Sequence, residues 1–187
     1  MKRAKMRTVL LPQIAAQSGS TEVIRKGKAS KPTEFGKMVK FQEAENQIIT
    51  HYEVFEKRLK DADLLVPALC KHEEQFGCVP QLVAGDAGFY SASNEAELQE
   101  MGVRQISVPN HFTKSPERGR HQKKRSFRRG QKWRTGAEGR ISVLKRRHGL
   151  NRCRYRGDAG MQRWVGLGVI ADNLINIGRF LAATNTG

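Results

Sequence analysis

Acidic residues are scarce in this 187-residue chain, which has 18 Asp and Glu against 34 Lys and Arg and a formal net charge of +16. Cysteines are scarce too, since Cys70, Cys78 and Cys153 are odd in number and share no metal-ligand spacing. This argues against a disulfide framework and predicts free thiols in a reducing compartment. The five histidines share no spacing with each other or with a cysteine, so a zinc site is not expected.

The chain also lacks internal repeats, a signal peptide and a long uninterrupted hydrophobic run. Its first residues are basic and then apolar, but the apolar part is short and contains Pro12. The apolar stretch Trp164–Ala183 holds polar residues, which predicts a packed helix and not a membrane span. Helical spacing predicts that this helix covers the sheet through Trp164, Leu167, Ile170, Leu174 and Ile177.

Positive charge is concentrated in about a quarter of the chain. Residues His111–Arg156 contain 17 Lys and Arg but only two acids, Glu117 and Glu138, and so hold +15 of the +16. A block of this kind is the electrostatic footprint of a nucleic-acid-binding protein. A solvated basic tail is the weaker alternative, because the block is interleaved with apolar residues such as Phe127, Trp133 and Leu144.

Hydrophobic periodicity predicts an α/β fold. Strands are expected at Met38–Phe41 and Ile48–Val54, joined as a hairpin, and the segment that follows alternates between helix and strand. The alternating elements are the helix Asp61–Phe76, the strand Val79–Ala84, the helix Asn94–Met101 and the strand Val103–Val108. This alternation implies parallel neighbours in the sheet. Beyond it we expect a basic connector at His111–Lys132 and helices at Thr135–Arg147 and Gly160–Ala183, while Met1–Ser20 shows no clear period.

Asp86 is the first candidate for chemistry, because it follows the apolar run that ends at Ala84. Open α/β sheets bind ligands beyond the carboxyl ends of their strands. Gly85 and Gly88 would let a ligand or a neighbouring backbone approach closely. An Asp at the end of a strand is also a common turn or helix-capping residue, and taken alone that role has the better odds.

Glu138 is the second candidate, as a lone carboxylate in a strongly cationic helix. It can form an exposed ion pair with Arg134 or Lys145, worth only about 0.3–0.5 kcal/mol. Alternatively it can reach toward Asp86 and share a Mg²⁺ ion, which favours one or two protein carboxylates plus substrate phosphate. Two metal ions held by three carboxylates can activate a water and stabilise the leaving 3′ oxygen of a phosphodiester.

Two segments, GDAGFYSASN from Gly85 and WRTGAEGRISVLKRRHGLNRCRYRG from Trp133, resemble bacterial insertion-sequence transposases of the DDE class. Asp86 matches the second catalytic Asp of that family. Arg134, Glu138 and Lys145 match the spacing of its later signature, which has a Tyr where this chain has Gln131. The resemblance spans roughly residues 21–180.

The resemblance implies a ribonuclease-H-like mixed sheet with helices on both faces. It implies that Asp86 and Glu138 bind Mg²⁺ or Mn²⁺ and that the partner is double-stranded DNA, as transposon ends and target, without a membrane. A homo-oligomer and a cytoplasmic, nucleoid-associated location are compatible with it. The expected DNA-binding residues are Lys132, Arg134, Arg140, Lys145, Arg146 and Arg147.

The first acid of the site has no clear match. Glu43 is our candidate and Glu45 its neighbour, although exposed hairpin residues are the more common role of such acids. Family members are longer at the N-terminus, which suggests a truncated copy. The expected organisation is an unassigned segment over residues 1–20 and a catalytic domain over residues 21–183, which includes a basic insertion at 111–132.

The sequence therefore predicts a transposase that cleaves and transfers DNA strands with a divalent metal, and that is inactive if truncation has removed part of the site. The alternative is a non-enzymatic, basic nucleic-acid-binding protein that needs only phosphate contacts. A nuclease of the same fold would share the acids but would not join strands.

Overall fold

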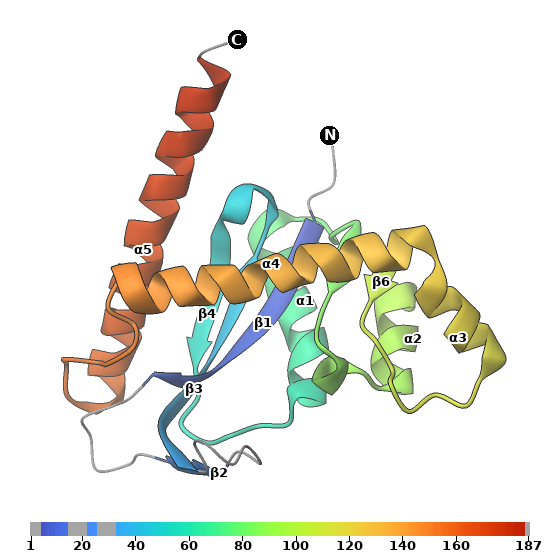
Figure 1. The fold of residues 1–187 in the computed structure, drawn as a ribbon, viewed down its shortest axis with the longest axis horizontal. Coiled ribbons are helices and arrows are strands. Elements are labelled where there is room, and N and C mark those ends of the chain that lie inside the picture. The colour runs from blue at the N-terminus through green and yellow to red at the C-terminus, as the bar shows by residue number, and fades with distance from the viewer. Residues whose placement is uncertain (1–4, 15–21, 26–32, 186–187) are drawn as a thin grey trace. The chain divides into compact units, whose positions relative to one another are not determined.

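The computed structural model describes residues 5–14, 22–25 and 33–185 and shows a mixed α/β protein (Figure 1). The chain forms two compact units, each assembled from three separate stretches. The first unit comprises Met1–Val9, Gln42–Glu45 and Leu59–Gly139. The second comprises Leu10–Phe41, Asn46–Arg58 and Arg140–Gly187.

Three parallel strands form the sheet of the first unit. The start of β1 (Lys5–Ile14) pairs with β5 (Leu82–Ala84), and β5 pairs with β6 (Gln105–Ser107). This confirms the predicted parallel neighbours. The first 20 residues, for which no element was predicted, contain β1. A strand in a parallel sheet does not need alternating polarity, so the period of two gave no signal there.

The helices of the first unit begin and end at residues with clear sequence signals. A 3₁₀ turn, η2 (Asp61–Leu64), leads into α1 (Leu65–Phe76), which ends at Gly77 with a left-handed φ of 65°. Ser91 precedes α2 (Ala92–Glu100), and its hydroxyl oxygen accepts a hydrogen bond from the backbone N–H of Asn94 at 3.0 Å. Both predicted helices are therefore confirmed.

The basic connector predicted at residues 111–132 is wrong, because most of it is helical. Ser115 caps α3 (Pro116–Lys123) by accepting from the backbone N–H of Arg118 at 3.3 Å, and Pro116 lies in its first turn. The next helix, α4 (Arg125–Arg147), begins ten residues before the predicted start at Thr135. The Lys, Arg and Gln residues that made this stretch look like a loop are good helix formers.

In the second unit β3 (Thr33–Glu43) neighbours β1 and pairs with two further strands. It pairs antiparallel with β2 (Glu22–Arg25) and also pairs with β4 (Ile49–Val54). A short 3₁₀ turn, η1 (Glu45–Gln47), lies between β3 and β4. The predicted hairpin is confirmed.

The long helix α5 (Gly157–Thr184) packs through the first part of its length. Met161, Val165 and Val169 lie in a hydrophobic core with residues of β3, β4 and α4. Further along, the side chain of Asn173 bonds to both backbone groups of Ile49, each at 2.8 Å. An amide side chain thus takes the place of a neighbouring strand.

Of the core face predicted for α5, Trp164 does pack against the core, but the other four residues do not. Leu167, Ile170, Leu174 and Ile177 are 45–64% exposed. The buried face instead uses small residues that allow close approach, and a Cβ on Gly168 would lie 2.8 Å from Leu150. The helix carries two apolar stripes, and spacing alone could not choose between them.

By length and composition α5 could also cross a membrane, although a third of that stretch is buried inside the protein. It is the one such helix in the part of the chain that the structure describes.

Candidate carboxylate site

Asp86 follows β5 and is fixed by the turn that begins there. Its Oδ1 accepts a hydrogen bond from the backbone N–H of Ala87 at 2.5 Å and caps the 3₁₀ turn η3 (Ala87–Phe89). The capping role considered from the sequence is therefore present. It uses one carboxylate oxygen and leaves Oδ2 to face another group.

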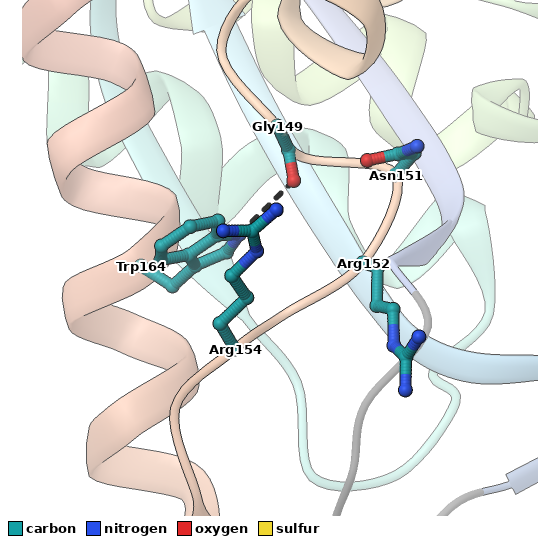
Figure 2. Close-up of a pocket in the computed structure, with 5 residues that line it drawn as sticks. All are labelled: Gly149, Asn151, Arg152, Arg154 and Trp164. Atoms are coloured by element: carbon teal, nitrogen blue, oxygen red, sulfur yellow. Dashed lines mark hydrogen bonds between the residues drawn. The ribbon is translucent and has the colours of Figure 1, made fainter.

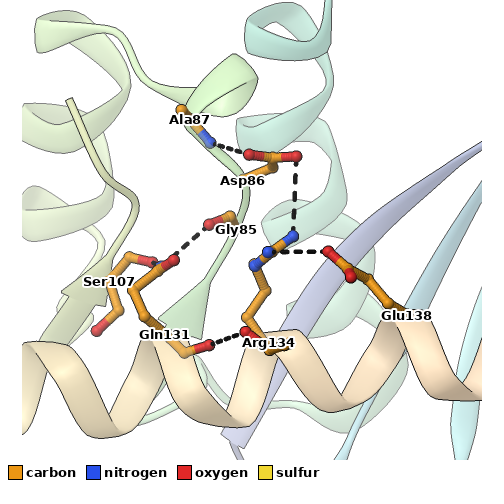
Figure 3. A network of polar contacts seen from close by, with 8 residues as sticks. Gly85, Asp86, Ala87, Ser107, Gln131, Arg134 and Glu138 are labelled. Carbon is orange, nitrogen blue, oxygen red and sulfur yellow. Dashed lines mark hydrogen bonds and ion pairs between the residues drawn. The ribbon is translucent and has the colours of Figure 1, made fainter. Parts of the chain in front are cut away.

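The helix α4 is anchored beside the carboxyl ends of β5 and β6. The side-chain amide of Gln131 donates to the backbone carbonyls of Gly85, at 3.1 Å, and of Ser107 (Figure 3). One residue earlier Gly130 packs against Ser107, and a Cβ on Gly130 would lie 2.6 Å from the Ser107 Cβ. These contacts fix which residues of the helix face Asp86.

Arg134 joins the two candidate carboxylates. One guanidinium nitrogen lies 3.7 Å from Asp86 Oδ2, and the other lies 3.1 Å from Glu138 Oε1. Figure 3 shows the guanidinium between the two acids, with Asp86 on the β5 side and Glu138 one turn further along α4. The ion pair between Arg134 and Glu138 that the sequence suggested is present, and it does not turn Glu138 away from Asp86.

The exposure of these side chains shows how the cluster is built. The side chains of Asp86 and Glu138 are 65% and 63% exposed, whereas that of Arg134 is 17% exposed. Exposed ion pairs contribute little to stability, typically about 0–1 kcal/mol. The cluster therefore stabilises the fold only weakly, and both carboxylates are accessible to a cation or a ligand.

The donor set at this position suits one hard cation better than a three-carboxylate centre. Two accessible carboxylates are what a Mg²⁺ ion usually takes from a protein. Among the residues that the structure describes, no group of three or more His, Cys, Asp or Glu side chains is placed to hold a metal ion. Arg134 now supplies the positive charge between the two acids.

Glu43, the proposed first acid, lies at the end of β3 and is 2% exposed, unlike its exposed neighbour Glu45. The more common role as an exposed hairpin residue thus does not describe Glu43. A third acid, Asp61, approaches the turn after Asp86, because a Cβ on Gly88 would lie 2.5 Å from its carboxyl oxygen. The sequence suggested only a helix-start role for Asp61.

The predicted DNA-binding residues fall into two groups. Lys132, Arg146 and Arg147 are exposed on α4, and Lys145 is half-buried. Arg140 differs, because it is 8% exposed and donates to both oxygens of the buried Asp172 at 2.9 and 3.2 Å. A guanidinium held in this way packs α4 against α5.

Sequence reasoning missed the residues that position the site. Gln131 looked like a departure from the transposase signature, yet its amide anchors the helix. The close contact between Gly130 and Ser107 had one signal, a glycine inside a helical stretch, and such a glycine often marks close packing.

Comparison with known proteins gives one result that bears on this site. Residues 97–177 match the protein family described as transposase DDE domain. The matched stretch includes Gln131, Arg134, Glu138 and Lys145 but begins after Asp86. No curated protein matches the chain.

Proposed function

We propose, from the premise that this chain is a DDE-class transposase, that it cleaves and transfers DNA strands at insertion-sequence ends with a divalent metal. One observation carries the proposal. Arg134 brings Asp86 and Glu138, which come from different elements, onto a single guanidinium. We further propose that the fold is ribonuclease-H-like, which the parallel pairing of β1, β5 and β6 supports.

Asp86 and Glu138 would hold Mg²⁺ or Mn²⁺, and Glu43, buried in the same unit, is our candidate for a third carboxylate. When bound, such an ion polarises a phosphodiester and lowers the pKa of a bound water. Asp86 Oδ1 is occupied by the backbone N–H of Ala87, so Oδ2 is the oxygen available to the ion. Arg134 would then release the carboxylates and bind a phosphate oxygen, which guanidinium groups recognise well.

The DNA would follow the exposed cations of α4. Lys132, Arg146 and Arg147 are exposed, and Lys145 lies about two turns from Glu138 on the same helix. Contacts of this kind release counterions, so affinity should fall steeply with salt. We place the protein in the cytoplasm, on the nucleoid.

We also propose that the protein is a homo-oligomer whose contact is α5. Five apolar residues of that helix recur at alternating intervals of three and four residues and are 45–64% exposed; they are Leu167, Ile170, Leu174, Ile177 and Leu181. This interval is the heptad pattern by which helices form coiled coils. We call these five residues the apolar stripe of α5. The partner that fits this stripe is the α5 helix of a second copy of the chain.

The test of the carboxylate site is a calorimetric titration with Mn²⁺ and Mg²⁺ of the wild type, Asp86→Asn and a control, Asp63→Asn. Asp63 is another exposed acid of the first unit. We expect Asp86→Asn to lose metal binding and Asp63→Asn to keep it. If the wild type binds no metal, the carboxylates are not a metal site and a basic DNA-binding protein remains.

A cleavage assay on a labelled insertion-sequence end tests the reaction. We expect Glu138→Gln to abolish metal-dependent cleavage while DNA binding survives, because the substitution removes a charge from the site but no cation from the helix. Cleavage that persists in Glu138→Gln would show that this residue is not part of the reaction.

A further inference from the structure

The segment between α4 and α5 lines a cavity of about 500 Å³ within the second unit (Figure 2). The residues that line it are Gly149, Asn151, Arg152, Arg154 and Trp164. None of them takes part in the cluster of Asp86, Arg134 and Glu138. A volume of this size lies in the range of small-ligand sites and exceeds what a single phosphate ion would fill.

The backbone of this segment is held in place by its apolar residues. Leu150 and Cys153 are fully buried in the hydrophobic core. The backbone N–H of Leu150 donates to the carbonyl of Leu144 at 3.2 Å, and that of Arg152 donates to Gly149 at 3.4 Å. The arginines therefore extend from a fixed loop, so that less conformational entropy is lost when they bind a ligand.

Trp164 is a half-buried wall of the cavity. Its indole N–H donates to the carbonyl of Gly149 at 3.2 Å, and Figure 2 shows this contact at the upper edge of the site. Gly149 has a left-handed φ of 69°, and a Cβ there would lie 3.3 Å from the indole ring. The single polar group of the indole is thus already satisfied, and the ring can offer a ligand only its apolar surface.

The two arginines carry charge without a matching acid. Arg152 and Arg154 are exposed, and no carboxylate among the described residues pairs with either of them. Their side chains leave the loop in different directions, with Arg154 running along Trp164 and Arg152 away from it (Figure 2). Guanidinium groups bind phosphate through a planar fork of donors.

We propose that this cavity binds one unpaired nucleotide of a DNA strand, with its base against Trp164 and its phosphate on Arg154. Arg152 then takes the neighbouring phosphate, and the Asn151 amide lies beside the base edge. An aromatic wall combined with separated cations is the arrangement that binds single-stranded nucleic acid through stacking and backbone contacts. The inference rests on the proposed function, since a protein that cleaves and transfers DNA strands handles strand ends, where nucleotides can unpair.

The test uses Trp164 as its own reporter. The chain has two tryptophans, so Trp133→Phe leaves Trp164 as the sole indole. In that background we would titrate a 12-nucleotide oligothymidine, an abasic strand of equal length and a blunt duplex while recording fluorescence. Oligothymidine should quench Trp164, because a stacked base contacts the ring, and the abasic strand should bind without quenching.

A charge-matched pair of variants tests the arginines. Arg152→Gln combined with Arg154→Gln should weaken oligothymidine binding by roughly 10-fold or more and duplex binding by much less. Arg104→Gln combined with Arg179→Gln removes the same charge from two other exposed positions and should affect both ligands equally and weakly. A similar loss of oligothymidine affinity in both double variants would mean that only the overall charge matters. That result would contradict the proposed nucleotide site.

The outcomes separate this inference from the proposed function. Equal quenching by the abasic strand would show that no base enters the cavity. Salt-dependent duplex binding without any quenching of Trp164 would show that the cavity does not bind a nucleotide. The transposase proposal would not be affected. If the wild type binds neither strand nor duplex, the proposed function fails and the nucleotide site fails with it.

Discussion

Arg134 is the residue on which the carboxylate site depends, because it is the counter-ion of two acids at once. Asp86 and Glu138 would repel each other if no cation lay between them, since both side chains are carboxylates. The guanidinium keeps them close in the absence of metal and competes with any cation that binds them. The same side chain thus organises the site and limits its affinity.

Removing this competitor should strengthen metal binding. Two exposed ion pairs are together worth roughly 1 kcal/mol, so Arg134→Gln should bind Mn²⁺ about 3–10-fold more tightly than the wild type. Isothermal calorimetry measures the change, and Arg128→Gln, which removes an exposed charge elsewhere on α4, serves as the control. Weaker binding by Arg134→Gln would mean that gathering the acids matters more than competing with the ion.

His72 gives the protein a pH-dependent stability. It lies fully buried in α1 with its ring 4.7 Å from that of Phe76, and burial lowers its pKa below the ordinary value of 6.5. The unfolded chain therefore takes up a proton near pH 6.5 that the folded chain does not. Stability is complete above this pH and falls as the pH drops below it, by at most about 1.4 kcal/mol per unit.

Urea unfolding between pH 8 and pH 5 tests this expectation. His72→Leu should show a shallower loss of unfolding free energy than the wild type below pH 6.5. His121, whose pKa is lowered by burial and by the charge of Arg118, should still contribute part of the slope. Parallel curves for the two proteins would show that His72 does not carry the effect.

At the scale of single residues, the two candidate carboxylates could be predicted from the sequence. The residues that hold them in position could not. Asp86 and Glu138 were recognisable because charge and position made each unusual. The role of Gln131 depends on two backbone carbonyls from different strands, and no local pattern encodes such contacts. The burial of Arg140 was hidden because its partner, Asp172, is 32 residues away.

Among the elements, α4 links every part of the candidate site, and its glycines have opposite roles. Gly139 faces open space, since a Cβ there would meet no atom within 4 Å, whereas Gly130 packs tightly on Ser107. An exposed helical glycine costs about 1 kcal/mol relative to alanine. A glycine at a close contact cannot be replaced without moving the neighbouring atoms.

Two substitutions in α4 should therefore have opposite signs. Gly139→Ala should raise the free energy of unfolding by about 0.5–1 kcal/mol. Gly130→Ala should lower it by roughly 1–3 kcal/mol, because the new methyl group overlaps Ser107. Chemical denaturation measures both, and a gain from Gly130→Ala would show that α4 is not seated on β6 as described.

The elements that the sequence predicted well have signals at their ends. Gly77 ends α1 and Ser91 starts α2, and both ends were within a few residues of the prediction. The start of α4 and the whole of α3 were missed because dense positive charge conceals the sparse apolar positions of a helix. For α5 the period was right and the face was wrong, since small buried residues carry little hydrophobic signal.

At the scale of the whole molecule, the stripe on α5 predicts the oligomeric state. The wild type should have a mass above that of the 21.1 kDa monomer in light scattering at micromolar concentration. Leu174→Glu should be monomeric, because it places a charge in the middle of the apolar seam. Leu59→Glu changes another exposed leucine and should leave the mass unchanged.

Two results would contradict this interface. A wild type that stays monomeric at all concentrations would show that α5 does not bind a second copy. Aggregation that only detergent reverses would indicate that the apolar stripe of α5 contacts a membrane. The length of α5 permits this.

The fold class of the protein could be predicted from the sequence, but its division into two compact units could not. Alternating helices and strands indicated the α/β class, and the charge block predicts a polyanionic partner. Each of the two units is assembled from three separate stretches of chain, so no linker or change in composition marks a boundary. Only long-range contacts define such units, and a single sequence does not contain them.

The anchoring of α4 has a consequence for how this protein can change over time. Gln131 binds main-chain carbonyls, which are present whatever side chains β5 and β6 carry. Substitutions along those strands can therefore accumulate without shifting the register of the helix, except at Leu82 and Ser107, whose side chains lie against Gly130. The spacing of the two acids is therefore little affected by other changes in the strands and depends on the Gln131 amide and on the close contact at Gly130.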